Sequence, residues 1–363
     1  MKKAIIAVPY LKGMGGTETV IKNFAEALDV KKIDNDISWK LISFGGSDKS
    51  DWLKDWNKKV YNFSKMRDIQ LVAYATIMPF LIASILKKEK PDFFIATNPI
   101  IWSIAYKLKK SVSPNTKIIA WYHYSFKMKR IKPKYLQRAD EFWAISTGIE
   151  KELVSLGVSK AKIRVIFNPI NVQSTSYVKR SSNNNHYIYI GRIDYDGQKN
   201  VAELIHALTK VEGKWTCDLY GSVDDNTKIK LYRLAKKNKI DNKIHFKGFY
   251  SNVWEKINNG DILVLTSKFE GLPMVLCEAA AHGLFLVSAN CPTGVADIVD
   301  PKKNGRLYKP GNYLELASIL NEIEEGKIKI NSQSDIVNSV NKFGYKSYKS
   351  RIIDSLQKLE RMN

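Results

Sequence analysis

Short apolar segments recur along the chain at the spacing of βα units. Each is followed by a stretch in which apolar residues return every three or four positions, as on one face of a helix. The expected strands are 4–8, 39–44, 93–97, 118–121, 142–145 and 163–166 in the first half, and 187–190, 215–220, 244–246, 262–265 and 285–288 in the second. Strands that alternate with helices predict parallel sheets covered on both faces.

A polar stretch separates the two series of strands. The segment 168–185 is rich in Ser, Asn, Thr and Lys and ends in Ser-Ser-Asn-Asn-Asn, which is typical of an exposed linker. The pattern therefore predicts two tandem doubly wound α/β domains, with ligands bound in a cleft at the carboxyl ends of the strands. The expected divisions are an N-terminal domain at 1–168, a linker at 169–186, a C-terminal domain at 187–344 and a final helix at 345–363 that packs on the first domain.

One apolar segment raises the question of a membrane-spanning helix. Residues 69–86 carry no charge over 18 positions, which is the threshold length for a membrane-spanning helix. Polar residues within the segment and its position between strand-like segments favour a buried core helix. A membrane-surface or re-entrant element and a true span are the alternatives.

The chain has 363 residues, and 58 Lys and Arg against 36 Asp and Glu give a net charge of +22. With 44% hydrophobic residues and no low-complexity tract, a disordered, collagen-like or coiled-coil chain is excluded. Three cysteines without Cys-x-x-Cys spacing argue against a disulfide framework and a cysteine-rich zinc site. This cysteine usage favours a reducing cytoplasm. The first apolar run, Ala4–Val8, is too short for a signal peptide and is expected to form a buried strand.

The positive charge is densest in one part of the first half, which we call the basic patch. Aromatic and aliphatic side chains interleave its six cations, Lys127, Lys129, Arg130, Lys132, Lys134 and Arg138. Such a patch attracts polyanions, so anionic lipid head groups, a phosphorylated glycan or nucleic acid would satisfy it. Nucleic acid is disfavoured because no recognisable nucleic-acid module accompanies the patch. A solvated basic face that serves only solubility is the alternative.

A glycine-rich turn follows the first expected strand. Gly13-Met14-Gly15-Gly16-Thr17-Glu18 opens a helix, and backbone N–H groups at such a turn can approach a phosphate. The third glycine of the dinucleotide-binding fingerprint is missing. A plain tight turn is therefore the alternative.

Two further motifs follow strands of the second half. Gly191-Arg192 and Lys199 could neutralise a diphosphate, or could be ordinary surface cations. The segment 270–278, Glu-Gly-Leu-Pro-Met-Val-Leu-Cys-Glu, places a proline at the first turn of a helix, where free N–H groups form an anion site. The first glutamate could simply cap this helix. Because Glu278 lies in an apolar helical stretch, a buried partner for it is more plausible than a surface position.

The order and spacing of these motifs resemble glycosyltransferase family 4, whose members are retaining enzymes with the GT-B fold. Within that family, Ile145-Ser-Thr-Gly-Ile, Val165-Ile-Phe-Asn-Pro, Gly197-Gln-Lys and Phe269-Glu-Gly-Leu-Pro-Met resemble the lipopolysaccharide-core 1,6-galactosyltransferase subgroup. The resemblance covers nearly the whole chain and is weakest over 49–90. It implies transfer of a hexose, galactose or glucose, from a UDP-sugar to a hydroxyl of a cell-surface glycan or lipid-linked acceptor.

The resemblance also implies roles for individual residues. Arg192 and Lys199 would hold the diphosphate, Glu278 would accept hydrogen bonds from the ribose hydroxyls, and Glu270 and His123 would lie near the donor sugar. Gly221 and Phe249 lie at strand ends where a base pocket would form. The expected catalytic residues are His123, Glu270, Arg192 and Lys199, and the expected substrate-binding residues are Gly15, Gly16, Glu18, Gly191, Gly221, Phe249, Gly271, Leu272, Met274, Val275 and Glu278.

Fixed cations and N–H dipoles at the leaving diphosphate would lower the barrier to sugar transfer, so no metal cofactor is expected. Unlike retaining glycosidases, this family is thought to react on the face that the leaving group departs from, so Glu270 is not assigned as a nucleophile. A transferase of UDP-N-acetylhexosamines, a GT-B nucleotide-sugar epimerase, a sugar phosphorylase and a non-catalytic basic lipid or nucleic-acid binder are the alternatives. We expect a cytoplasmic enzyme that associates peripherally with the inner face of the membrane.

Overall fold

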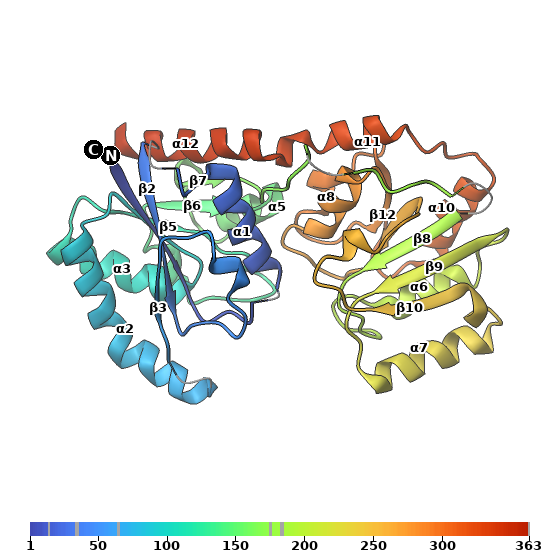
Figure 1. The fold of residues 1–363 in the computed structure, drawn as a ribbon, viewed down its shortest axis with the longest axis horizontal. Coiled ribbons are helices and arrows are strands. Elements are labelled where there is room, and N and C mark those ends of the chain that lie inside the picture. The colour runs from blue at the N-terminus through green and yellow to red at the C-terminus, as the bar shows by residue number, and fades with distance from the viewer. Residues whose placement is uncertain (14, 33–35, 64–65, 174–175, 182–184, 362–363) are drawn as a thin grey trace. The chain divides into compact units, whose positions relative to one another are not determined.

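The computed structural model describes residues 1–13, 15–32, 36–63, 66–173, 176–181 and 185–361. The chain divides into two compact units (Figure 1). The first unit comprises Met1–Pro169 together with Tyr345–Asn363, and the second comprises Ile170–Gly344. Each unit holds one parallel sheet with helices packed against it.

The first unit contains a seven-stranded sheet in the order β3-β2-β1-β4-β5-β6-β7. Its strands are β1 Lys2–Val8, β2 Ile37–Phe44, β3 Lys58–Tyr61, β4 Phe93–Ala96, β5 Lys117–Ala120, β6 Glu141–Ala144 and β7 Ile163–Val165. Its helices are α1 Gly16–Leu28, α2 Arg67–Glu89, α3 Pro99–Val112, α4 Pro133–Leu136, α5 Thr147–Ser155 and α12 Tyr345–Arg361. The central strands read as unbroken apolar runs because both of their faces are buried, as in Ile5, Ile6 and Phe94.

The final helix, α12, belongs to the first unit. Its Tyr348 ring lies 5.9 Å from the ring of Phe24 on α1, and the Ser355 Oγ accepts a hydrogen bond of 2.8 Å from the Trp143 indole on β6. Tyr348, Ile352, Leu356 and Leu359 recur at helical spacing and are buried, so one stripe of α12 completes the core of this unit.

The second unit contains a six-stranded sheet in the order β10-β9-β8-β11-β12-β13. Its strands are β8 Asn185–Ile190, β9 Trp215–Tyr220, β10 Ile244–Gly248, β11 Ile262–Leu265, β12 Phe285–Ala289 and β13 Gly305–Tyr308. Its helices are α6 Val201–Leu208, α7 Asp225–Lys237, α8 Met274–Ala281, α9 Val295–Ile298, α10 Tyr313–Glu324 and α11 Gln333–Ser339. All pairings in both sheets are parallel, so every strand of a sheet ends at the same edge, which we call its carboxyl edge.

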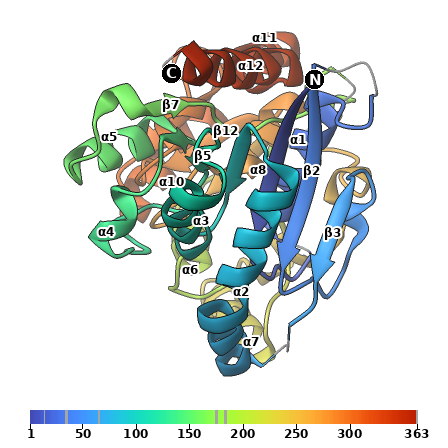
Figure 2. The ribbon, with the colours of Figure 1, turned by 90° about the vertical axis from the view of Figure 1, so that its left-hand side faces the viewer.

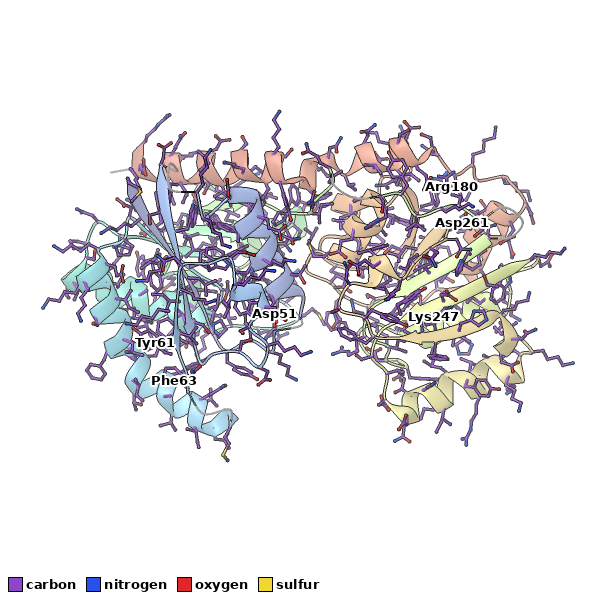
Figure 3. The ribbon with its side chains drawn as sticks, viewed as in Figure 1. Asp51, Tyr61, Phe63, Arg180, Lys247 and Asp261 are labelled. Carbon is purple, nitrogen blue, oxygen red and sulfur yellow. The ribbon has the colours of Figure 1, made fainter. Side chains whose placement is uncertain are left out.

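The segment 169–186, expected to form an exposed linker, is exposed at several of its described positions but is anchored at two buried ones. Ile170 and Val178 are buried, and their backbone N–H groups each donate a hydrogen bond of 3.0 Å, to Phe343 and His282 respectively. Asp261 holds the start of β8, because its carboxylate accepts hydrogen bonds from the backbone of Ser181 (3.0 Å) and His186 (2.8 Å) (Figure 3). Two buried aliphatic side chains thus outweigh the polar composition, and the segment packs on the second unit.

The long apolar helix α2 is not the fully buried core helix that the sequence favoured. One of its faces packs against α3, beside which it lies in Figure 2, and Met78, Ile82 and Leu86 on that face are buried. The opposite face exposes large apolar side chains, among them Val72 and Phe80. Within the described chain, the segment Asp68–Glu89 is the one helix long and apolar enough to cross a membrane by length and composition.

Candidate functional site

The parallel topology gathers most of the predicted site residues at the two carboxyl edges. In the first unit the glycine-rich turn follows β1 and His123 follows β5. In the second unit Gly191 follows β8, Gly221 follows β9 and Glu270 follows β11. Loops at this edge of open α/β sheets are where such folds bind their ligands.

The glycine-rich turn uses Glu18 as an internal brace. The buried Glu18 carboxylate accepts a hydrogen bond of 2.7 Å from the backbone N–H of Gly13 and so closes the turn. Gly15 is the N-cap residue of α1, and a side chain on Gly16 would meet open space. The first N–H groups of a helix have no partner within the helix, so this exposed turn can receive an anion. Met14 lies outside the described residues.

His123 is held in an apolar environment at the carboxyl edge of the first sheet. Its ring lies 4.6 Å from the Trp121 ring, and neither of its buried nitrogens has a hydrogen-bond partner among the described residues. Burial lowers the pKa of His123 to about 3, so the imidazole is neutral at pH 7. A neutral, unsatisfied imidazole is suited to exchange hydrogen bonds with sugar hydroxyls.

Glu152 on α5 organises the loop that carries the basic patch, and the sequence interpretation missed it. Its buried carboxylate accepts hydrogen bonds from the Ser125 hydroxyl (2.7 Å) and the Phe126 backbone (2.8 Å). Five of the six patch cations are exposed beyond this anchor, whereas Arg138 donates to the Ser103 hydroxyl at 3.0 Å. The available signal was a glutamate between Ile149 and Leu153 on the apolar stripe of an amphipathic helix.

Three glycines end neighbouring strands of the second sheet and tie their loops together. The N–H of Gly191 donates to Tyr220, and the N–H of Gly221 donates to Gly248, both at 2.9 Å. A Cβ on Gly221 would lie 1.7 Å from the carbonyl oxygen of Gly191, and its φ of 154° disfavours other residues. Gly221 is therefore required for close approach of the loops after β8 and β9, apart from any contact with a ligand.

Gly221→Ala is expected to destabilise the fold by about 2–4 kcal/mol, because backbone strain and a steric clash act together. Gly248→Ala is the matched control. It also has a positive φ, 81°, but a side chain there meets open space, so a loss of about 1 kcal/mol is expected. Urea unfolding followed by circular dichroism measures both, and equal losses would contradict the close-approach argument.

Lys199 and Glu270 form an ion pair at the carboxyl edge of the second sheet. The Lys199 Nζ lies 2.6 Å from the Glu270 Oε1, and the two side chains are only 18% and 11% exposed. The loops that carry them are joined, since the Thr266 hydroxyl donates to the Lys199 carbonyl at 2.9 Å and the Lys268 N–H donates to the Gln198 carbonyl at 2.8 Å. The structure thus brings together two predicted catalytic residues that are 71 positions apart.

Arg192 is the exposed cation of the same region. Its side chain is 62% exposed and lies 3.6 Å from the carboxylate of Asp194. Asp194 also accepts hydrogen bonds from the backbone N–H groups of Lys199 (3.1 Å) and Asn200 (2.9 Å), so it shapes the loop after β8. A long exposed guanidinium beside a fixed ammonium is suited to bind a diphosphate.

The loop before α8 presents unpaired backbone donors. Pro273 is the N-cap residue rather than the first helical residue, and α8 has no side-chain cap. The loop is fixed by Thr293, whose hydroxyl donates to the carbonyls of Glu270 (2.8 Å) and Gly271 (2.9 Å). Leu272 packs into the core, and the N–H groups of Met274 and Val275 begin the helix, where the helix dipole favours an anion.

Glu278 has the partner that its apolar surroundings predicted, and the partner is Trp254. The indole Nε1 donates to the Glu278 carboxylate at 3.2 Å, while the indole ring stacks on His282 with centroids 4.3 Å apart. Burial raises the pKa of Glu278, and the hydrogen bond from Trp254 opposes part of that rise. Phe249, at the end of β10, is exposed and can offer a ring face to a base.

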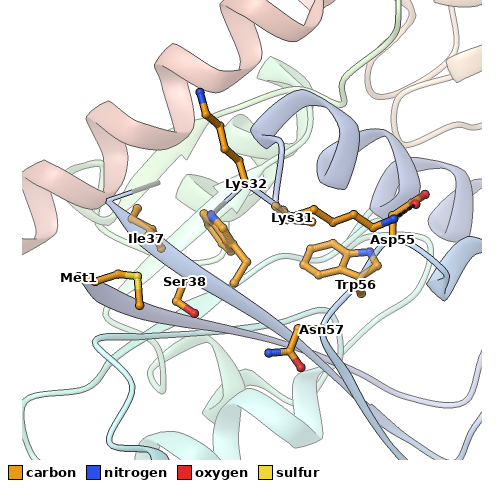
Figure 4. A pocket seen from close by; sticks show the side chains of 10 residues that line it. Met1, Lys31, Lys32, Ile37, Ser38, Asp55, Trp56 and Asn57 are labelled. Carbon is orange, nitrogen blue, oxygen red and sulfur yellow. Dashed lines mark hydrogen bonds and ion pairs between the residues drawn. The ribbon is translucent and has the colours of Figure 1, made fainter. Parts of the chain in front are cut away.

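A pocket of about 430 Å³ lies elsewhere in the first unit (Figure 4). It is lined by residues that precede or begin β1 and β2, such as Met1, Ile37 and Ser38, and Lys31 and Asp55 pair at 2.7 Å beside it. This is the amino edge of the sheet, opposite to the edge that carries His123. The pocket is therefore separate from the predicted site.

Comparison with known proteins identifies the class. Two family models match, Glycosyltransferase Family 4 over residues 14–174 and Glycosyl transferases group 1 over residues 176–359. The chain belongs to this family of glycosyltransferases and is an enzyme of that class. Its two parallel sheets with flanking helices confirm the predicted GT-B fold.

The chain is also similar to individual members of this family along nearly its whole length. The chain is 30% identical over 355 residues to the lipopolysaccharide 1,6-galactosyltransferase of Escherichia coli K12, covering 96% of this chain and 95% of the relative. It superposes on the apo structure of the lipopolysaccharide outer core galactosyltransferase WaaB with a TM-score of 0.87 and 26% identity, covering 98% and 99% of the two chains. Anabaena HepE in complex with UDP-glucose shares the fold at 17% identity, with a TM-score of 0.76 over 99% and 100% of the two chains.

Proposed function

We propose that this glycosyltransferase transfers a hexose from a UDP-sugar to a hydroxyl of a lipopolysaccharide-core acceptor, with retention of the anomeric configuration. Galactose is the favoured sugar. The observation that carries the proposal is the similarity to a lipopolysaccharide 1,6-galactosyltransferase along almost the whole of both chains. Glucose and N-acetylhexosamines remain the competing sugars. The family membership argues against the epimerase, phosphorylase and non-catalytic alternatives.

In the proposed reaction, the bond between the anomeric carbon and the diphosphate oxygen breaks, the acceptor oxygen bonds to the anomeric carbon, and the acceptor proton passes to the leaving diphosphate. Negative charge builds on the UDP as it leaves. Arg192, Lys199 and the N-terminus of α8 would stabilise that charge, and Glu278 would hold the ribose. Lys199 pairs with Glu270 at 2.6 Å, which supports a positioning role for this glutamate rather than attack on the sugar. From the first unit, neutral His123 would bind sugar hydroxyls. We propose that no metal takes part.

A ligand panel tests the donor. UDP-galactose, UDP-glucose, UDP-N-acetylhexosamines, GDP-mannose and UDP are compared by thermal shift and by slow hydrolysis, each with and without EDTA. UDP-galactose is expected to raise Tm most, because a ligand that binds only the folded state stabilises it; at 100 times Kd the gain is about 2.7 kcal/mol. A response to GDP-mannose alone would overturn the UDP assignment, and loss of all responses in EDTA would overturn the metal-free mechanism.

A second experiment tests the acceptor and the stereochemistry. Truncated lipopolysaccharide cores that lack the terminal galactose are incubated with the donor, and the product linkage is read by NMR. An α-linked product from an α-linked donor is expected. A β-linked product would contradict retention, and transfer only to acceptors unrelated to lipopolysaccharide would reassign the acceptor while leaving the donor result intact.

A further inference from the structure

The exposed face of α2 has a composition that a water-facing helix rarely carries. The large side chains on this face, which we call the α2 face, are Ile69, Val72, Ile77 and Phe80. Phe80 is 78% exposed and Val72 is 61% exposed. Exposed apolar residues that occur singly need no explanation, but four on one face within twelve positions of a helix form a patch of the kind that marks an interaction surface.

The α2 face points away from the packed side of the helix, and the length of α2 carries its first turns beyond the sheet. With 23 residues the helix is about 34 Å long, whereas the four residues of β3 or β4 span only about 13 Å. Because α2 follows β3, its first turns begin at the carboxyl edge, and Figures 1 and 2 show them extending past the ends of the strands. The α2 face is therefore presented at the edge where the proposed chemistry takes place.

Electrostatic charge indicates which partner would cover this face. The first unit contains 35 Lys and Arg against 17 Asp and Glu, a net charge of +18, so it carries most of the +22 of the whole chain. Lys87 and Lys88 end α2, and the basic patch follows β5 at the same carboxyl edge. A second copy of so positive a unit would be repelled, whereas an anionic lipid surface would be attracted.

The packed face of α2 decides between lying on a membrane and crossing it. Tyr74 donates a hydrogen bond of 2.8 Å to the Phe44 carbonyl and accepts one of 3.0 Å from the Tyr10 backbone. Together with buried Met78 and Ile82, these contacts fix the helix to the domain. A membrane-spanning arrangement would break them, whereas an interfacial arrangement inserts only the exposed face.

We propose that the α2 face inserts into the interface of an anionic lipid bilayer while the basic patch binds the head groups beside it. Apolar insertion and head-group attraction then act together, because neither a few side chains nor a few lysines bind a membrane tightly alone. Docking in this orientation brings the carboxyl edge of the first unit to the membrane surface. The inference stands on the first unit alone and does not depend on which sugar is transferred.

Vesicle flotation of the full chain tests the proposal. Wild type is expected to float with phosphatidylcholine vesicles that contain 30 mol% phosphatidylglycerol. Val72→Ser/Phe80→Ser is expected to bind at least about tenfold more weakly, because two apolar side chains that would insert into the bilayer become polar. The matched control is Tyr232→Ser on α7, an exposed helix of the second unit that also carries lysines. Wild-type binding by the double variant, or no binding by wild type, overturns the proposal.

Site-specific fluorescence locates the inserted face. The three native cysteines are buried, so an environment-sensitive dye can label Phe80→Cys selectively. Its emission is expected to shift to the blue with anionic vesicles, whereas a dye on Tyr232→Cys should not respond. If changing the basic patch to glutamine abolishes binding while the α2 variant binds normally, charge alone docks the protein and the α2 face is not inserted. Vesicle-independent dimerisation through α2 in sedimentation equilibrium also overturns the proposal.

Discussion

Lys199→Ala is expected to lower kcat for sugar transfer by about 10²–10³-fold, the usual effect of removing one group that stabilises transition-state charge. Lys199 is poised for this task because Glu270 holds its ammonium at 2.6 Å and Asp194 binds its backbone at 3.1 Å. Negative charge grows on the diphosphate as the sugar leaves, so the loss is expected in kcat more than in the donor KM. Steady-state kinetics with saturating UDP-galactose measures it.

The same substitution leaves the largely buried Glu270 without its cation, at a stability cost of about 3 kcal/mol. Lys199→Met/Glu270→Gln removes both charges and is expected to recover stability while transfer stays slow. Recovery of transfer in the double variant would mean that Lys199 serves only to neutralise Glu270. Lys268→Met, which removes an exposed cation from the neighbouring loop, is the matched control and should retain activity.

The strands that could be predicted from sequence are those that contain a short apolar segment, including the edge strands β7 and β10. For β9 and β11 the apolar runs gave the observed bounds, Trp215–Tyr220 and Ile262–Leu265. The edge strands β3 and β13 were missed because they contain Lys58, Lys59, Gly305 and Arg306 and show no continuous apolar run. An edge strand without such a segment is recognised by its neighbour in the sheet, which local composition does not encode.

The residues of the candidate site were likewise predicted only in part from the sequence. Motif spacing led to Lys199, Glu270 and Glu278, because these residues follow strands whose ends meet at one edge. Spacing could not lead to Trp254 or Glu152, since each becomes informative only through a partner distant in sequence, Glu278 or the backbone of Phe126. Nor could it show that Glu18 closes its own turn by accepting the Gly13 N–H.

The α2 helix shows a third limit. The residues 69–86 were predicted as a helix, and the structure has one, Arg67–Glu89. Apolar residues occur on all sides of this helix, so periodicity could not tell which face would be covered. Packing against α3 decides which side is covered, and the short strands beside the helix leave its first turns beyond the sheet.

Glu278→Gln is expected to weaken UDP binding by roughly 10- to 100-fold, since hydrogen bonds to a charged acceptor contribute about 1.5–3 kcal/mol. The substitution keeps the shape of the side chain and one of its oxygens. That oxygen can still accept the hydrogen bond from the Trp254 indole N–H, which is 3.2 Å long in the wild type. Isothermal titration with UDP measures the loss. An unchanged affinity would remove Glu278 from the proposed ribose contact.

The pH dependence provides an independent check on the same residue. Burial raises the pKa of Glu278, so the folded state holds its proton to a higher pH than the unfolded chain does. Ribose hydroxyls bind the carboxylate more strongly than the acid, and UDP affinity is therefore expected to rise as pH increases through that raised pKa. The raised pKa of Glu278 also lowers the free energy of unfolding at pH values above 4.5, the ordinary carboxyl pKa. In that range the unfolded chain releases the proton more readily than the folded state does.

Glu278→Gln should therefore remove this rise of UDP affinity with pH. Its thermal stability at pH 7 should equal or exceed that of wild type, because the variant buries no charge. Loss of affinity together with retained stability separates a binding role from a structural one. A variant with lower stability and an unchanged pH profile would instead assign Glu278 to the packing of α8 against Trp254 and His282.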